Sequence, residues 1–448
     1  MKKILFSILS IASVILLASC SSPKGLSSAA SKYLIADTAL KNAHTGIAVF
    51  DPESGKFLYE YQDDKYFVPA SNTKIMSCYA AMKTLGDQLQ GISYVDMDTA
   101  LVLIPTGDPT FLHKDYKDQP VADFIRNSKK KIYIDASAWS DQALGFGWSW
   151  DDYSEYYMAE RSALPVYGNV VRWYQVKSKK ENPANAADTI DTFIYSDPEL
   201  DGPVDFGKPE NGFRVERKRD SNAFTIYEGK EKNAETDVPY VTDGVNTGIK
   251  LLNDSLHKEI FTIEAGKKIR YTTKPSVIFS RPVDSMLKPM MHRSDNFFAE
   301  QALLMSGYSI TGVMNSGVAV QAITKQLLTG MPDKAKWVDG SGLSRYNLFT
   351  PRDFVWVLDK MKKEISWERI TTVFPTGGRG TLRTYSADSG RLYAKTGTLS
   401  GVIALSGYVI TKKNKTLIFS ILINNHQQPT AVLRSKMAAF LGEIIENY

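Results

Sequence analysis

Residues 69–74 read Pro-Ala-Ser-Asn-Thr-Lys, and the apolar segment that follows them, residues 75–85, has the spacing of a helix. Ser71 and Lys74 are three residues apart, so a helix would place them on one face, one turn from each other. A lysine amine removes the proton of a serine hydroxyl only where burial or a neighbouring cation lowers the lysine pKa. The stretch therefore predicts a nucleophilic serine at the start of a helix, with Lys74 as its candidate base. Ser-x-x-Lys alone is a common pattern, so this prediction needs support from the rest of the chain.

Composition and charge exclude several classes of protein. The chain has 448 residues, of which 43% are hydrophobic and 23% charged, as is typical of a globular protein of two or three domains. Its 54 basic and 49 acidic residues are interspersed, so the sequence does not indicate a nucleic-acid partner. The five histidines share no helix-turn spacing, and they predict no metal site. We expect neither a metal nor another cofactor.

The first twenty residues are typical of a secretion signal. Two lysines precede an apolar run at residues 4–17, which is too short to span a bilayer. The run ends in Leu-Ala-Ser-Cys, which resembles a bacterial lipobox with Cys20 as the lipid-bearing residue. Ordinary cleavage after a small residue, with Cys20 incidental, is the alternative. We therefore predict a lipoprotein signal peptide at residues 1–20 and, from its serine-rich start, a tether at residues 21–39.

The rest of the chain alternates between two patterns. Residues 40–91 and 263–448 contain helical periodicities and strand pairs separated by turn residues. Residues 92–262 instead contain short apolar runs between turns, which indicate strands. We therefore predict one catalytic domain made of the first two ranges, interrupted by a β-rich insertion. Within the catalytic part, the buried face of the Ser71 helix includes Cys78 as a small apolar thiol.

Two further motifs follow the insertion. Ser294-Asp-Asn296 precedes a helical segment, and Lys395-Thr-Gly397 lies on a predicted strand. Together with Ser71-x-x-Lys74 and in this order, they are the signature of penicillin-recognising serine enzymes. The long interval between Ser71 and Ser294 makes the chain resemble the class C low-molecular-mass penicillin-binding proteins, the D-alanyl-D-alanine carboxypeptidase/endopeptidase family. The resemblance covers nearly all of residues 40–445.

The resemblance implies a fold and a set of catalytic residues. The fold would be α/β, a β-lactamase/transpeptidase-like domain whose antiparallel sheet is flanked by helices, with a large, mostly-β insertion. Ser71 would be the nucleophile and Lys74 its base. Ser294 would relay a proton to the leaving amine, and Asn296 would hold Lys74 and bind the peptide carbonyl of the substrate. Asp295 between them is expected to cap the following helix.

The resemblance also implies the residues that bind substrate. Lys395, Thr396, Gly397 and Thr398 would form the substrate-binding strand, and the lysine would contact the terminal carboxylate. The backbone N–H groups of Ser71 and Thr398 would form the oxyanion hole. The resemblance also covers the glycine-rich turn at residues 339–345, which is expected to position other groups. Contact of Ser341 and Arg345 with substrate is the alternative.

The implied activity is that of a serine D-Ala-D-Ala carboxypeptidase/endopeptidase. Its substrates would be peptidoglycan stem peptides, its inhibitors β-lactams, and its location the periplasmic side of the cell envelope, held to a membrane by a lipid. Three alternatives stay open. They are a β-lactamase, a serine amidase on the same fold, and a catalytically silent wall-binding lipoprotein. The Glu-x-x-Leu-Asn pattern of class A β-lactamases is absent between Asn296 and Lys395, which disfavours the first.

Overall fold

An antiparallel five-stranded sheet forms the centre of the catalytic domain. The computed structural model describes residues 23–180, 189–263, 271, 273–385 and 389–448. The sheet joins the beginning and the end of the chain, because its first strand pairs with its last one. In spatial order its strands are β14 (Leu392–Leu399), β15 (Val402–Ile410), β16 (Thr416–Asn424), β1 (His44–Asp51) and β2 (Lys56–Tyr61). The strand pairs predicted in the catalytic ranges are confirmed as the hairpins β1–β2 and β15–β16.

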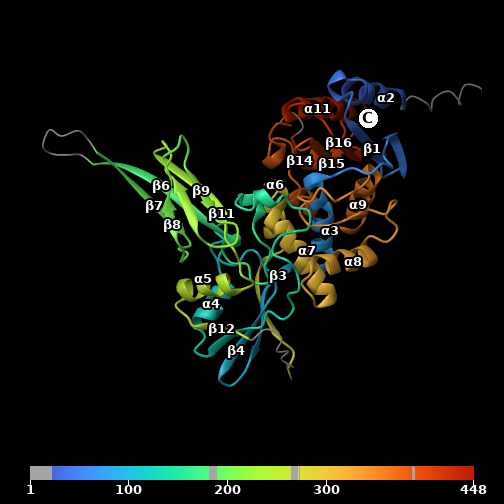
Figure 1. Cartoon of the computed structure of the whole chain (residues 1–448). Coiled ribbons are helices and arrows are strands. Elements are labelled where there is room, and N and C mark those ends of the chain that lie inside the picture. The colour runs from blue at the N-terminus through green and yellow to red at the C-terminus, as the bar shows by residue number, and fades with distance from the viewer. Residues whose placement is uncertain (1–22, 181–188, 264–270, 272, 386–388) are drawn as a thin grey trace, which may run out of the picture.

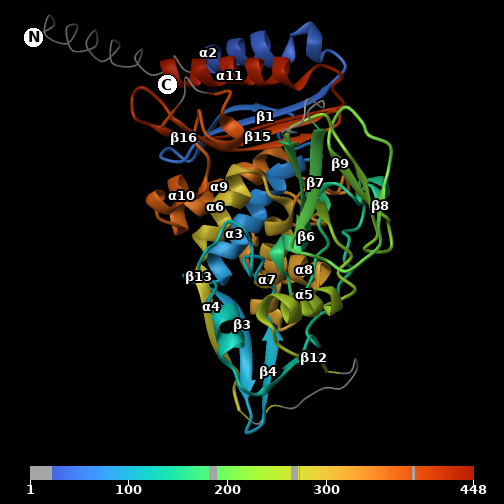
Figure 2. The same cartoon turned by 90° about the vertical axis from the view of Figure 1, so that its left-hand side faces the viewer.

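Helices cover both faces of this sheet (Figure 2). Helices α2 (Pro23–Ala30) and α11 (Thr430–Asn447) lie on one face. The other face is covered by a larger group of helices, and this three-layer arrangement confirms the predicted α/β class. The group consists of α3 (Lys74–Thr84), α6 (Asp284–His292), α7 (Asn296–Thr311), α8 (Ser316–Leu327), α9 (Pro351–Glu364) and α10 (Trp367–Val373).

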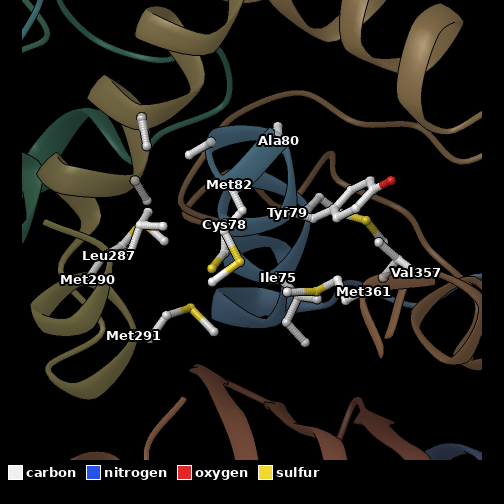
Figure 3. Packing of buried hydrophobic residues seen from close by; sticks show 14 of the residues in the cluster. Ile75, Cys78, Tyr79, Ala80, Met82, Leu287, Met290, Met291, Val357 and Met361 are labelled. Atoms are coloured by element: carbon white, nitrogen blue, oxygen red, sulfur yellow. The ribbon is translucent and has the colours of Figure 1, made fainter. Parts of the chain in front are cut away.

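Helix α3 is buried on all sides. Every residue from Lys74 to Met82 is buried, so the apolar stripe predicted from spacing describes only part of the buried surface. Figure 3 shows that Cys78 and Met82 face the α6 residues Leu287, Met290 and Met291. Residues of α9 pack against the opposite side of the helix. Because such burial excludes water, a charged lysine at the start of α3 loses solvation.

The described part of the insertion forms three sheets and, besides short 3-10 turns, two α-helices. Figure 1 shows these sheets apart from the catalytic domain. A mixed five-stranded sheet packs against α4 (Pro120–Asn127) and α5 (Asn246–Leu256). Its strands, in spatial order, are β12 (Ile260–Thr262), β5 (Lys131–Ile134), β4 (Ala100–Pro105), β3 (Gln88–Asp96) and β13 (Ser276–Pro282). Two three-stranded sheets complete the insertion. In spatial order, the first contains β11 (Asn233–Pro239), β6 (Val170–Lys180) and β7 (Thr189–Asp197). The second contains β8 (Val204–Phe206), β10 (Phe224–Tyr227) and β9 (Arg214–Arg217).

The pairing of β3 with β13 corrects the predicted domain boundaries. The insertion was expected at residues 92–262, but its outer strands begin at Gln88 and end at Pro282. The two strands lie far apart in sequence, and a pairing of this kind leaves no local pattern to detect. The catalytic domain therefore resumes at α6.

The predicted tether at residues 21–39 is also corrected. Residues 21 and 22 lie outside the described residues, as do the predicted signal peptide and Cys20. From Pro23 onward the chain is helical, and Leu26, Ala30 and Leu34 are buried together with Leu433 and Phe440 of α11. The apolar residues recur every fourth position, and this spacing outweighs the serine-rich composition. Among the described residues, no helix combines the length and apolarity needed to cross a membrane.

Candidate active site

Ser71 lies in a tight turn that leads into α3. Residues Ala70–Thr73 form a single 3-10 turn, and Asn72 fixes it to the sheet through a 2.7 Å hydrogen bond from its Nδ2 to Ser406 Oγ of β15. Ala70 has a φ of 48°, a left-handed conformation that is uncommon for a residue with a side chain. Such conformations cluster at functional sites because the surrounding structure must hold them in place. The turn therefore presents Ser71 in one defined position.

Two glycines let other segments approach this turn closely. A Cβ atom on Gly397 would lie 2.6 Å from the carbonyl oxygen of Pro69, so only glycine lets strand β14 pass beside the turn. Gly342 has a φ of 80°, and a Cβ atom there would lie 1.9 Å from the carbonyl oxygen of Ala70. The predicted site residue Gly397 thus acts through packing.

Lys74 is fully buried and makes three hydrogen bonds. Its Nζ donates to Ser71 Oγ at 3.0 Å, to Asn296 Oδ1 at 2.7 Å and to the carbonyl oxygen of Ser341 at 2.7 Å. Burial lowers the pKa of Lys74 to about 8, while the carboxylates of Asp339, Glu300 and Asp295 act in the opposite direction. The three acceptors match the three protons of the ammonium. Loss of one proton leaves a lone pair that can accept the proton of Ser71.

Ser294 is paired with the second buried lysine. Lys395 Nζ donates to Ser294 Oγ at 2.9 Å and to the carbonyl oxygen of Thr396 at 2.6 Å. Burial, and then the charge of Lys74, lower the pKa of Lys395 well below its usual range. Burial is therefore the first cause of the lowered pKa of both lysines.

Asn296 connects Lys74 to the insertion. Its Oδ1 accepts from Lys74, and its Nδ2 donates to the carbonyl oxygen of Tyr157 at 3.0 Å. Asp295 caps α7 as expected, because its side chain accepts from the backbone N–H of Phe298. The three motifs that the sequence predicted to converge are therefore in contact around Ser71 and Lys74.

A buried acidic residue that the sequence analysis did not assign supports Lys74. Glu300 Oε1 accepts from the backbone N–H of Ser341 at 2.7 Å, and Arg161 lies 3.7 Å from its other oxygen. Burial, and then the charge of Asp339, raise the pKa of Glu300 to about 7. Glu300 follows Asn296 by four residues, which places both on one face of α7. That spacing is the signal in the sequence that could have identified it.

The turn at residues 339–345 positions groups, as expected. Asp339 is fully buried and accepts from the backbone N–H groups of Gly342 and Ser344. It also accepts from the side chains of Asn347 and Trp148. These hydrogen bonds fix the position of the Ser341 carbonyl oxygen, which accepts a hydrogen bond from Lys74 Nζ.

A cleft of about 1090 Å³ opens over Ser71. Its walls contain the predicted residues Ser294, Asn296, Thr396 and Thr398, and the insertion contributes another part of them. Among the described residues, four arginines and one acidic residue line the cleft, so its charge favours anionic substrates. These charged residues are Arg293, Arg345, Arg383, Arg434 and Asp152. In the described part of the chain, no group of three or more His, Cys, Asp or Glu side chains is placed to hold a metal ion.

Comparison with known proteins places this site in a family. The sequence profile of the D-Ala-D-Ala carboxypeptidase 3 (S13) family matches residues 27–444. The chain is similar to the D-alanyl-D-alanine carboxypeptidase of Actinomadura sp., with 26% identity over 450 residues that cover 92% of this chain and 83% of the relative. It is also similar to the D-alanyl-D-alanine carboxypeptidase DacB of Haemophilus influenzae, with 24% identity and coverage of 88% of both chains.

Solved structures show the same fold. The crystal structure of penicillin binding protein 4 (dacB) from Haemophilus influenzae superimposes with a TM-score of 0.73 at 19% identity, covering 94% of this chain and 98% of that one. A second structure of that protein, complexed with a novel β-lactam, gives a TM-score of 0.71 at 18% identity, with coverage of 94% and 99%. The resemblance inferred from the three motifs is confirmed. Because the profile extends from α2 to α11, the chain belongs to the D-Ala-D-Ala carboxypeptidase 3 (S13) family.

Proposed function

We propose that the protein hydrolyses peptidoglycan stem peptides that end in D-Ala-D-Ala, through an acyl-enzyme on Ser71, and that β-lactams inhibit it by acylating the same serine. The 3.0 Å hydrogen bond between Lys74 Nζ and Ser71 Oγ carries this proposal, because it joins a nucleophile to a base of lowered pKa. The carboxypeptidases among its relatives support the substrate class. The β-lactam complex of penicillin binding protein 4 supports the inhibitor class.

Acylation follows from the arrangement of the two lysine–serine pairs. Neutral Lys74 takes the proton of Ser71 as Oγ attacks the carbonyl carbon of the penultimate D-Ala. The backbone N–H groups of Ser71 and Thr398 stabilise the oxyanion. As the C–N bond breaks, Ser294 passes a proton to the leaving amine and recovers one from Lys74. Water then cleaves the ester, which returns a proton to Ser71 and releases the shortened peptide.

The contacts of Lys395 and Asn296 support two proposed roles. These are proton relay by Ser294 and binding of the substrate's peptide carbonyl by Asn296. Lys395 donates to Ser294 Oγ, which leaves the serine's own proton free for the leaving amine. Ser294 has a φ of 62°, so its backbone is held in a left-handed conformation at the cleft wall. Asn296 has a second amide proton besides the one given to Tyr157, and this proton can bind the substrate's peptide carbonyl.

The positions of the glutamates disfavour a β-lactamase. A class A β-lactamase deacylates quickly because a glutamate activates the attacking water, and that glutamate would have to lie near the nucleophile. Between Asn296 and Lys395 the glutamates are Glu300, Glu364 and Glu368. Glu300 is buried and bound to Ser341, while Glu364 pairs with Lys83 and Lys360. None of the three lines the cleft over Ser71. This arrangement instead favours an enzyme that is acylated by β-lactams and hydrolyses the resulting acyl-enzyme slowly.

We also propose that Cys20 carries a lipid that holds the enzyme at a membrane, on its periplasmic side. The lipobox supports this proposal. Each buried methylene of an acyl chain contributes about 0.8 kcal/mol, so two or more acyl chains give stable attachment to a membrane. Only two residues separate Cys20 from Pro23, where α2 begins, so the anchor would keep the catalytic domain close to the membrane surface. Detergent phase partitioning of the full chain tests it, with Cys20→Ser as the control. Recovery of both proteins in the aqueous phase would refute the anchor.

The peptidase activity is tested by release of D-alanine from a peptide that ends in D-Ala-D-Ala. Purified monomeric and cross-linked muropeptides, analysed by mass spectrometry, separate carboxypeptidase from endopeptidase cleavage. We expect loss of one D-Ala, hydrolysis of the cross-link, or both, and none with Ser71→Ala. An intact peptide and intact cross-links after incubation with the wild type would contradict the proposal.

A further inference from the structure

Lys395 is poorly placed to bind a substrate carboxylate. Its side chain is fully buried, and its Nζ already donates to Ser294 Oγ and to the Thr396 carbonyl. It does not line the cleft over Ser71, whereas Thr396 and Thr398 of the same strand do. Burial and the charge of Lys74 both disfavour its protonated form. A positive charge that binds the terminal carboxylate of the substrate would therefore come from a residue other than Lys395.

Arg434 lies beside the exposed end of this strand. It belongs to α11, where the buried residues Leu433 and Met437 fix which face of the helix packs on the sheet. The guanidinium then reaches the cleft, and its Nη2 lies 3.5 Å from Thr398 Oγ1. Arg434 forms no ion pair with any carboxylate in the described part of the chain. Its remaining donors are available to a ligand.

Two other arginines of the cleft already have protein partners. Arg293 pairs with Asp115, and Arg345 Nη2 donates to the carbonyl oxygen of Ser400 at 2.8 Å. Arg383 also lines the cleft, but no hydrogen bond links it to strand β14. Arg434 is thus the cleft arginine whose side chain contacts a residue of the substrate-binding strand.

We propose that Arg434 and the hydroxyl of Thr398 form the site that binds the C-terminal carboxylate of the leaving residue. The inference rests on the proposed peptidase function and deepens it, since it names what selects a free carboxylate. A guanidinium is always charged, and it can bind a carboxylate through two parallel hydrogen bonds. The hydroxyl of Thr398 adds a third donor. Lys395 then serves Ser294, and the two basic side chains have separate tasks.

The test compares two peptides that differ only at the C-terminus. One ends in D-Ala-D-Ala with a free carboxylate, and the other carries a C-terminal carboxamide. We expect Arg434→Gln and Arg434→Ala to lower kcat/KM for the free acid by about 10- to 100-fold, as loss of a charge-assisted contact does. The same variants should change kcat/KM for the carboxamide less than about twofold. Arg434→Lys, which keeps the charge but not the planar fork, should retain part of the selectivity.

The matched control is Lys436→Gln on the same helix. Lys436 pairs with Asp37 of the N-terminal segment, so this variant removes one positive charge from α11 without touching the cleft. It should leave both rates unchanged, and thermal unfolding checks that all variants fold. Equal losses of the Arg434 variants on both peptides, or no loss on the free acid, would overturn the proposal. If the wild type releases neither D-alanine from the free acid nor D-alaninamide from the carboxamide, the peptidase function itself fails.

Discussion

Glu300 and Lys74 are connected through the backbone of Ser341. The carboxylate of Glu300 accepts the N–H of Ser341, and the carbonyl of the same residue accepts from Lys74 Nζ. Both side chains are fully buried, so their charges interact with little screening by solvent. This connection couples the protonation of Lys74, the proposed base, to a carboxylate that does not line the cleft.

Acylation should depend on pH through Lys74. Its pKa in the folded enzyme is lowered to about 8, and only the neutral amine can accept the proton of Ser71. The acylation rate with penicillin should therefore rise with pH and level off above about 8. Lys74→Met should acylate far more slowly and lose this rise. Stopped-flow or gel-based acylation rates across pH 6–10 measure it, and a rate that falls with pH over this range would be inconsistent with Lys74 as the base.

Glu300→Gln should move that rise to lower pH. The negative charge of Glu300 raises the pKa of Lys74, so a neutral isostere that still accepts from Ser341 lowers it. The change would be visible as a shifted midpoint of acylation rate against pH, with a plateau within about tenfold of the wild type. Glu300→Ala is the contrasting variant. It removes the acceptor of the Ser341 N–H and leaves a cavity, so it should lower the rate at every pH. A midpoint that moves upward in Glu300→Gln would argue against the coupling.

Lys395→Met should reduce activity equally on free-acid and carboxamide peptides. Its amine donates to Ser294, and the variant leaves that hydroxyl without its donor. A loss of about 1–3 kcal/mol in transition-state stabilisation is expected, because a polar group in a buried site loses its hydrogen-bond partner. The comparison uses kcat/KM for both peptides. A loss confined to the free acid would show that Lys395, and not Arg434, recognises the carboxylate.

Leu34→Ala should destabilise the catalytic domain by about 2–5 kcal/mol. Leu34 is fully buried against α11 in the N-terminal segment that composition alone suggested was a tether. Ser28→Ala is the matched control, since Ser28 is exposed on α2. Chemical denaturation of both variants measures the difference. Equal stability of Leu34→Ala and wild type would mean that this segment contributes nothing to folding.

The parts of the structure that local sequence determines were predictable. The helix that follows Ser71, the cap at Asp295 and the strand that begins at Leu392 depend on residues within a few positions of each other. The 3-10 turn that holds Ser71 itself ahead of that helix was not predicted. Their convergence could be inferred because three motifs in one order are rare by chance. The pairing of hairpin strands also follows from short intervals.

Contacts between distant segments were not predictable. The β3–β13 pairing, the bond from Glu300 to Ser341 and the approach of Arg434 to Thr398 each join residues separated by an element or more. A single sequence gives no signal for such pairs, since only the folded chain brings them together. The N-terminal helix was missed for a different reason. Its serine-rich composition favoured a tether, although an apolar residue recurs at every fourth position, as in a helix that packs on a core.

The central claim is that Ser71 is the nucleophile, held ready by Lys74. Mass mapping of the peptide labelled by penicillin tests it most directly, with Ser71→Ala as the control. We predict one adduct, on Ser71, and a loss of at least about four orders of magnitude in peptidase rate for the variant. An adduct on another serine, or full activity of Ser71→Ala, would contradict the account.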